Sequence, residues 1–173
     1  MEKWVVTAKK ADFQGIGRKY GIDPVIARII RNRDITGDEA IEEYLNGTLA
    51  DIPSWKLLKD IDKAVEIISG KIDAGTKMRI IGDYDIDGVT ATYILLKGFK
   101  RLGANVDTYI PDRVADGYGI HDHLIKKAME DGIDTIVTCD NGISASSQIT
   151  YAKELGMTVV VTDHHEVPFT DTE

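Results

Sequence analysis

The strongest constraint on the fold is an alternation of short apolar segments and amphipathic segments in the second half of the chain. Four segments have the β-branched, apolar character of buried strands, and a segment with helical periodicity follows each of the first three. Such strand–helix–strand repeats build a parallel sheet that is covered on both faces. We therefore expect an α/β fold with a doubly wound, mainly parallel sheet. The expected strands are 78–81, 106–110, 135–138 and 158–162, and the expected helices are roughly 89–102, 121–130 and 144–155.

Residues 1–75 differ in texture, because apolar residues recur there at helical spacing without strand-like runs. Thr36 and Glu39 have the spacing of a capping box, which predicts that Thr36 is the N-cap of a helix that begins after it. We expect a short helical segment over 1–75 ahead of a sheet domain over 76–173. Its expected helices begin at Pro24, after Thr36, and near Asp60.

Length and composition favour a soluble protein of one domain with a short appendage. The chain has 173 residues and is 43% hydrophobic, which is enough to bury a core. Its single cysteine, Cys139, permits no internal disulfide and indicates a reducing compartment. Residues Met1–Lys10 lack the pattern of a signal peptide, and no apolar run is long enough to span a membrane. We expect a cytoplasmic protein without a membrane partner.

The formal net charge of −8 argues against a simple electrostatic nucleic-acid binder, which would be basic in order to neutralise phosphates. It is compatible with a hydrolase that gathers carboxylates around divalent cations, since a bound metal inverts the local charge. Much of the acidity also lies on expected helix surfaces, where it serves solubility.

Ligands of open parallel sheets bind beyond the carboxyl ends of the strands, so the residues that follow each strand are the candidates for a site. Asp83 and Asp85 follow the first strand and alternate along the chain, which aims both carboxylates at one pocket. Two close carboxylates need a cation, and oxygen ligands suit Mg²⁺ or Mn²⁺. Asp87 could equally cap the helix that follows or take part in the pocket.

Asp140 ends the third strand and is followed by Asn141-Gly142, a pair that on its own would indicate only a turn. Its place among the other strand ends instead makes it a candidate for bridging two metals.

Asp163-His164-His165, after the fourth strand, is the sharpest signal. Imidazole is a suitable ligand for Mn²⁺, and a neighbouring carboxylate can orient a ligating ring. An exposed loop is the alternative. By contrast, His121 and His123 lie at an expected helix start, and we assign them no metal role.

The loop after the second strand offers substrate contacts. Arg113 is suited to bidentate phosphate binding, and Tyr118, which lies between two glycines, can stack on a base. An ordinary glycine-rich turn is the alternative. Cys139 has no evident base partner and is expected to be a strand residue rather than a nucleophile.

Together these motifs resemble the DHH phosphoesterase superfamily and, within it, the RecJ family of bacterial single-stranded-DNA-specific exonucleases. The resemblance rests on four ordered segments and covers nearly the whole chain. These segments are 82–88 (GDYDIDG), 110–119 (IPDRVADGYG), 138–143 (TCDNGI) and 162–166 (TDHHE).

The resemblance implies a 5′→3′ exonuclease of recombination and repair that uses two Mn²⁺ or Mg²⁺ ions. Single-stranded DNA would be its substrate, and repair proteins such as a helicase or a single-strand-binding protein its partners. Asp140 would be shared by both ions, and Asp140→Ala is predicted to abolish nuclease activity. Mapped onto this sequence, the metal ligands would be Asp83, Asp85, Asp140 and His164; the catalytic groups Asp140, His165 and Asp163; and the substrate contacts Arg113, Tyr118, Asp87 and Asn141.

Two departures from the superfamily pattern matter. Small-molecule phosphatases of the superfamily have a histidine four residues before the first aspartate. This chain has Arg79 there, so that ligand is absent, as it is in the RecJ family. The chain also stops soon after its fourth strand, before a further metal-binding aspartate and a substrate-gripping domain that the family has. We therefore expect residues 76–173 to be an incomplete DHH domain of a fragment that is weakly active or inactive.

Two other functions stay open. A DHH phosphodiesterase for short oligonucleotides or cyclic dinucleotides would share the metal site and differ in the missing domain. A non-catalytic scaffold of repair or replication would not need intact carboxylates and both histidines.

Overall fold

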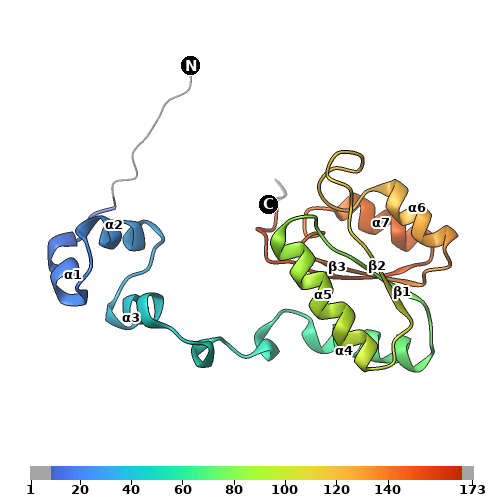
Figure 1. Ribbon diagram of the computed structural model, residues 1–173, viewed down its shortest axis with the longest axis horizontal. Coiled ribbons are helices and arrows are strands. Elements are labelled where there is room, and N and C mark those ends of the chain that lie inside the picture. The colour runs from blue at the N-terminus through green and yellow to red at the C-terminus, as the bar shows by residue number, and fades with distance from the viewer. Residues whose placement is uncertain (1–8, 169–173) are drawn as a thin grey trace, which may run out of the picture. The chain divides into compact units, whose positions relative to one another are not determined.

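The computed structural model describes residues 9–168 of the chain, in two compact units that divide between Leu57 and Leu58 (Figure 1). The predictions about the first residues, Met1–Lys10, fall almost entirely outside the described residues. Residues 169–173, at the end of the chain, also lie outside the described residues.

The first unit contains three α-helices and two 3₁₀ turns. Asp12 caps the first helix by accepting a hydrogen bond from the Gly15 amide, and Asp23 caps the second by accepting one from the Val25 amide. Apolar side chains of the second and third helices supply the buried residues Ala27, Ile30 and Ile41. The elements are α1 (Phe13–Tyr20), α2 (Pro24–Asn32), α3 (Asp38–Asn46), η1 (Leu49–Asp51) and η2 (Trp55–Leu57).

The capping box predicted at Thr36 is wrong. Helix α3 begins at Asp38, and the residue before it, Gly37, has a φ of 86° and caps the helix without a side chain. Thr36 therefore lies one residue too early to reach the first amides. A capping box does form at Thr48, whose partner is Asp51 in η1.

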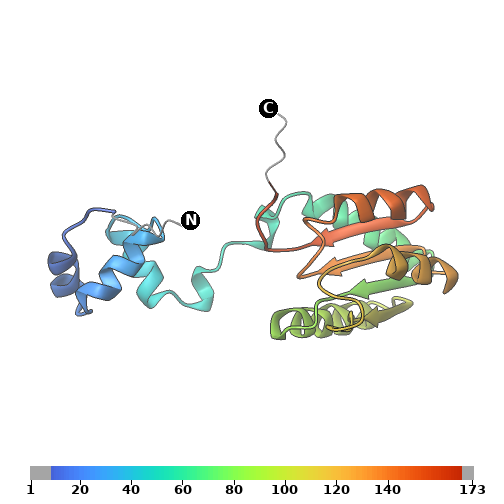
Figure 2. The same ribbon diagram turned by 90° about the horizontal axis from the view of Figure 1, so that it is seen from above.

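The second unit is built on a parallel four-stranded sheet in the order β2-β1-β3-β4. Neighbouring strands are in register, with Met78 of β1 opposite Val106 of β2 and Thr135 of β3. Figure 2 shows the four strands side by side in this order. The α/β fold with a parallel sheet is as predicted. The strands are β1 (Met78–Ile81), β2 (Val106–Tyr109), β3 (Thr135–Cys139) and β4 (Thr158–Thr162).

Helices cover both faces of this sheet, as a doubly wound fold requires. Figure 1 shows α6 and α7 on one side and α4 and α5 on the other. One buried cluster includes Ile136 of β3 with side chains of α6 and α7, and the other includes Ile80 of β1 with side chains of α4 and α5. The helices are α4 (Ile61–Asp73), α5 (Ile86–Arg101), α6 (Asp122–Glu130) and α7 (Ser146–Glu154).

Helix α4 belongs to the sheet unit, which corrects the predicted boundary at residue 75. Its apolar side chains, among them Ala64, Ile68 and Ile72, pack against the cluster formed by β1, β3 and α5. The sequence pattern showed an amphipathic helix but not what its apolar face contacts. The division of the chain therefore lies at Leu57, ahead of this helix.

The strand order places a topological switch point between β1 and β3. From β1 the chain crosses to β2 on one side, and from β2 it returns to β3 on the other side of β1. The connections thus leave β1 and β3 in opposite directions, which opens a crevice beyond their carboxyl ends. The segments that follow these two strands contain Asp83, Asp85 and Asp140.

Arg79 is a buried structural cation in this sheet. It is 8% exposed, and its guanidinium donates two hydrogen bonds to Asp107, the residue opposite it on β2, at 2.7 and 2.8 Å. A third bond of 2.9 Å reaches Asp131, which caps the carboxyl end of α6. These bonds, first of all those to Asp107, raise the pKa of Arg79 above its ordinary value. Arg79 therefore ties β1 to β2 and to α6.

In the described part of the chain, no helix combines the length and the apolar character needed to cross a bilayer.

Candidate metal centre

The turn from β1 into α5 positions Asp83 and Asp85. Helix α5 begins at Ile86, three residues earlier than predicted, and Asp85 is its N-cap. The Asp85 carboxylate accepts hydrogen bonds from the amides of Asp87 and Gly88, at 3.0 and 2.9 Å. Asp87 is therefore not the cap. It lies exposed in the first turn of the helix, outside the candidate metal groups found in the described residues.

Gly82 and Gly88 allow this turn to close tightly. A Cβ at Gly88 would come within 2.6 Å of the backbone nitrogen and oxygen of Asp83, and one at Gly82 within 1.9 Å of the Thr92 hydroxyl. The first turn of α5 thus lies directly on the backbone of Asp83. Only glycine permits that approach, so the motif fixes Asp83 against the start of the helix.

Asp140 follows β3 and completes a cluster of three carboxylates. It is 7% exposed, and Asp83 is 2% exposed. One oxygen from each of Asp83, Asp85 and Asp140 lies within 4.8 Å of the others. Asp140 has a φ of 61°, a left-handed conformation that Asp and Asn tolerate better than other side chains. The backbone is thus bent to turn this carboxylate toward β1.

The carboxylates of this cluster differ in their titration. Burial, followed by the charge of Asp85, raises the pKa of Asp140. Hydrogen bonds from the helix amides, chiefly that of Gly88, lower the pKa of Asp85. Oδ1 of Asp83 is buried and has no hydrogen-bond partner. A buried carboxylate oxygen without a partner, facing two further carboxylates, is the arrangement that a cation would satisfy.

His164 and His165 approach the same cluster from the end of β4. Nε2 of His164 lies 2.8 Å from Oδ1 of Asp140. One ligand atom from each of Asp140, His164 and His165 lies within 4.8 Å of the others, so this second group shares Asp140 with the first. The structure therefore brings together the five residues that the sequence analysis assigned to the strand ends.

Asp163 organises this turn. Its buried carboxylate accepts hydrogen bonds from the amides of Ile143, His164 and His165, at 3.0, 2.8 and 3.1 Å. It also lies 2.7 Å from Nδ1 of His165. Burial works against ionisation of Asp163, but these bonds outweigh it and lower its pKa. The hydrogen bond that the His165 ring donates to Asp163 is in turn the main reason that the pKa of His165 is raised. Asp163 thus orients the His165 ring and favours its charged form.

Asn141 does not lie where a substrate contact was predicted. It is 1% exposed, and its Nδ2 donates to the carbonyls of Ile81 and Cys139, at 3.2 and 3.1 Å. The side chain therefore joins the ends of β1 and β3 instead of facing solvent. Cys139 is buried in β3, as predicted, with its sulfur 3.4 Å from the Thr92 hydroxyl.

The loop between β2 and α6 brings Arg113 and Tyr118 to the cluster. The Tyr118 hydroxyl lies 3.4 Å from Nε2 of His165, and their rings meet edge to face at 6.1 Å. Tyr84, between the two aspartates of the first motif, contacts the Tyr118 ring in the same manner at 6.4 Å. The Arg113 guanidinium lies over the Tyr84 ring at 5.0 Å. The sequence analysis did not assign a role to Tyr84.

Asp116 anchors this loop, and the sequence analysis missed its role. Its carboxylate accepts bonds from the Asp112 amide and the Tyr109 hydroxyl, at 2.8 and 3.0 Å, and lies 2.7 Å from Nε2 of His123. These bonds, first of all that from Asp112, lower the pKa of Asp116. The sequence signal for this contact was that Asp116 and His123 lie on either side of a helix start. His123 lies outside both candidate metal groups found in the described residues.

The donor set fits divalent cations that prefer oxygen and accept imidazole. Three carboxylates and two imidazoles converge on one crevice, and such a mixture suits Mn²⁺ or Mg²⁺ better than the sulfur-rich sites of zinc or iron–sulfur clusters. In the described part of the chain, no lysine or arginine lies within ion-pair distance of Asp83, Asp85 or Asp140. The buried Oδ1 of Asp83, which has no hydrogen-bond partner, could therefore act as a ligand of such a cation.

Comparison with known protein families identifies the domain that contains these residues. The DHH family, N-terminal domain, matches residues 77–173, which include every residue of the centre. The chain belongs to the DHH family. Its RecJ-like character is equally clear: the chain is 37% identical over 145 residues to the single-stranded-DNA-specific exonuclease RecJ of Salmonella typhimurium.

The match to that exonuclease covers 83% of this chain and 24% of the relative, so the chain spans about a quarter of the relative's length. A crystal structure of exonuclease RecJ bound to manganese is 36% identical with a TM-score of 0.63, over 71% of this chain and 31% of that one. RecJ of Thermus thermophilus in complex with Mn²⁺ is 28% identical with a TM-score of 0.59, over 91% and 22%. These similarities confirm the predicted DHH and RecJ resemblance of a chain much shorter than its relatives.

Proposed function

We propose that this chain forms the greater part of the metal-binding centre of a phosphodiester hydrolase that degrades single-stranded DNA from the 5′ end. One observation carries the proposal: two groups of candidate ligands share Asp140 at the switch point of a parallel sheet. This chain belongs to the DHH family and resembles a single-stranded-DNA exonuclease over 83% of its length, which supports the same class of reaction.

Two divalent cations, Mn²⁺ or Mg²⁺, are the proposed cofactors. Asp83 and Asp85 would hold one, His164 would hold the other, and Asp140 would contact both. Cations held in this way polarise a phosphoryl oxygen and make water a stronger acid. Two similar solved structures, both RecJ, are bound to Mn²⁺.

The protein groups around the ligands would handle charge on the phosphate. His165 is held by Asp163 at 2.7 Å, and its raised pKa favours the imidazolium. A positioned imidazolium donates to a phosphoryl oxygen as negative charge develops there. Tyr118, next to His165, and Arg113, nearby in the same loop, add a hydroxyl and a guanidinium to the same side of the crevice.

Single-stranded DNA fits the surroundings of the centre better than a duplex does. Tyr118 offers an aromatic ring, and Arg113, which lies over the Tyr84 ring, offers a cation in the same loop. Aromatic rings stack on unpaired bases regardless of sequence, and basic side chains follow the backbone. We propose a role in recombination and repair inside the cell, in the cytoplasm, alongside a helicase or a single-strand-binding protein.

End-labelled DNA tests this function. With Mn²⁺, the chain should release nucleotides from single strands only weakly, by digestion that starts at the 5′ end, and EDTA or Asp140→Asn should stop it. Asn is the suitable replacement because it tolerates the left-handed backbone at this position, whereas Ala would add strain. Digestion that begins only at the 3′ end would contradict the proposal.

Two measurements separate the alternatives. Faster hydrolysis of cyclic dinucleotides or dinucleotides than of longer strands would identify a small-substrate phosphodiesterase. A failure to bind Mn²⁺ in calorimetry would favour a non-catalytic scaffold.

A further inference from the structure

Tyr84 contacts both side chains through which the loop between β2 and α6 reaches the centre. The Arg113 guanidinium lies 5.0 Å above its ring, and the Tyr118 ring meets it edge to face at 6.4 Å, with planes at 81°. We propose that Tyr84 is a positioning residue that holds Arg113, and with it a substrate phosphate, in register with the metal ligands. This inference rests on the proposed function.

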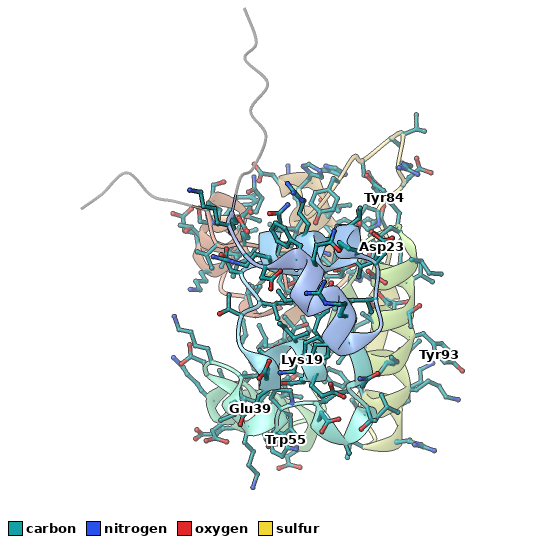
Figure 3. All side chains as sticks on the ribbon, turned by 90° about the vertical axis from the view of Figure 1, so that its left-hand side faces the viewer. Lys19, Asp23, Glu39, Trp55, Tyr84 and Tyr93 are labelled. Atoms are coloured by element: carbon teal, nitrogen blue, oxygen red, sulfur yellow. The ribbon has the colours of Figure 1, made fainter. Side chains whose placement is uncertain are left out.

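The backbone of Tyr84 is fixed on both sides. It follows Asp83, which is buried under Gly88, and it precedes Asp85, which caps α5. The ring itself is half-buried. Figure 3 shows Tyr84 beside the start of α5. Because Tyr84 lies between two fixed residues, a group that contacts its ring is held in a defined position relative to the carboxylates of Asp83 and Asp85.

Among the residues that the structure describes, Arg113 has no charged partner to fix it. It is exposed, next to Val114, which is 94% exposed, and in the described part of the chain no carboxylate lies within ion-pair distance of it. A free arginine samples many rotamers, all of which it must give up when it binds a phosphate. The Tyr84 ring restricts these rotamers beforehand through a cation–π contact.

The contact leaves the guanidinium able to bind a phosphate. A cation–π interaction uses the face of the guanidinium, whereas hydrogen bonds to a phosphate use its edge. Arg113 can therefore rest on Tyr84 and still donate two parallel bonds. By contrast, a carboxylate partner would occupy the same edge, as Asp107 does with Arg79.

Tyr93 supplies a matched control. It is 60% exposed on α5, and the Lys97 ammonium lies over its ring at 5.9 Å. Figure 3 shows Tyr93 pointing outward from the helix. This pair repeats the tyrosine–cation contact away from the loop and the carboxylates.

The test measures binding of a fluorescent single-stranded oligonucleotide with a nuclease-resistant backbone to the full chain with Mn²⁺, over a range of salt concentrations. Tyr84→Ala and Arg113→Ala should each weaken binding about three- to tenfold and lower the salt slope by roughly 0.7, the value for one phosphate on a single strand. The double variant should be no weaker than Arg113→Ala alone, because both changes remove the same contact. Tyr84→Phe keeps the ring and should bind within about twofold of the unchanged chain, as should Tyr93→Ala.

The outcomes separate cleanly. If Arg113→Ala weakens binding but Tyr84→Ala does not, or if the two effects add in the double variant, Tyr84 does not position Arg113. A loss in Tyr84→Phe equal to that in Tyr84→Ala would assign the effect to the hydroxyl and overturn the cation–π account.

A second readout does not depend on DNA. In nuclear magnetic resonance spectra, the Arg113 Nε–H signal should be displaced by the Tyr84 ring current and return toward its free position in Tyr84→Ala. An unchanged signal would overturn the inference even if the chain binds no DNA. Conversely, a displaced signal in a chain that does not bind single strands would contradict the proposed function and leave the support of Arg113 by Tyr84 intact. Thermal unfolding of each variant checks that the sheet unit remains folded.

Discussion

Two groups of acidic residues in the sheet unit are built on opposite principles. At Arg79, one buried guanidinium makes three hydrogen bonds to Asp107 and Asp131, so the carboxylates are neutralised by the protein itself. At Asp83, Asp85 and Asp140, three carboxylates converge without a lysine or arginine within reach in the described residues. The first group is complete as folded, whereas the second needs a cation from outside. The difference separates acidic residues that stabilise the fold from those that bind.

The largest predicted effect is at the complete group. Arg79→Ala should destabilise the sheet unit by about 3 kcal/mol, because it leaves two carboxylates that faced a buried cation. This figure is at the low end for a buried pair, since both carboxylates are about one-third exposed. Urea unfolding followed by circular dichroism measures it. A decrease in the free energy of unfolding of less than about 1 kcal/mol would show that the hydrogen bonds of Arg79 contribute little to the stability of the sheet unit.

A cation should stabilise the incomplete group by a similar amount. If Mn²⁺ binds only the folded chain, a concentration 100 times its dissociation constant stabilises by about 2.7 kcal/mol. We expect the thermal midpoint to rise with Mn²⁺ in the unchanged chain and not in Asp140→Asn. Asp107→Asn is the matched control, because it removes a carboxylate from the complete group and should keep the response to Mn²⁺. Equal responses in both variants would contradict the contrast.

Without metal, repulsion among Asp83, Asp85 and Asp140 should destabilise the folded chain. Asp140→Asn in EDTA should leave stability unchanged or raise it by up to about 1 kcal/mol, because it removes one of three like charges and keeps a residue suited to a φ of 61°. Urea unfolding is again the measurement. A clear loss would mean that the contact with His164 outweighs the repulsion.

The smallest predicted effect is a difference in pH dependence. Arg79 lowers the pKa of Asp131, so the stability that Asp131 contributes is present above the ordinary carboxyl range and is lost as the pH falls through its folded value. Burial raises the pKa of Asp140, so its contribution has the opposite sign and is lost as the pH rises through its folded value. Between about pH 3 and 5, Asp131→Asn should reduce the acid-induced loss of stability in EDTA, and Asp140→Asn should increase it. Changes of the same sign in both variants would refute this assignment.

The sequence was enough to predict that these side chains lie close together, because strand ends meet at one edge of a parallel sheet. Once four strands were recognised, Asp83, Asp140 and His164 had to converge whatever the details of packing. The features that escaped depend on contacts across the fold. The pairing of Arg79 with Asp107 requires the register of β1 and β2, and the inward position of Asn141 requires the spacing of β1 and β3.

Helix starts were the other source of error. Ile86 is 78% exposed, so the first turn of α5 carries no apolar periodicity, and the predicted start fell at Val89. As a result, capping was considered for Asp87 when Asp85 performs it. The packing of α4 on the sheet was likewise invisible, because an amphipathic pattern shows that a face is buried but not against which element.

Calorimetric titration of the chain with Mn²⁺ tests the central claim most directly. We predict that the unchanged chain and Asp107→Asn bind Mn²⁺ with similar affinity, and that Asp140→Asn binds it at least tenfold more weakly, because both ligand groups lose their shared residue. Binding of equal strength by the unchanged chain and Asp140→Asn, or no binding by the unchanged chain, would contradict the assignment of this crevice as a metal centre.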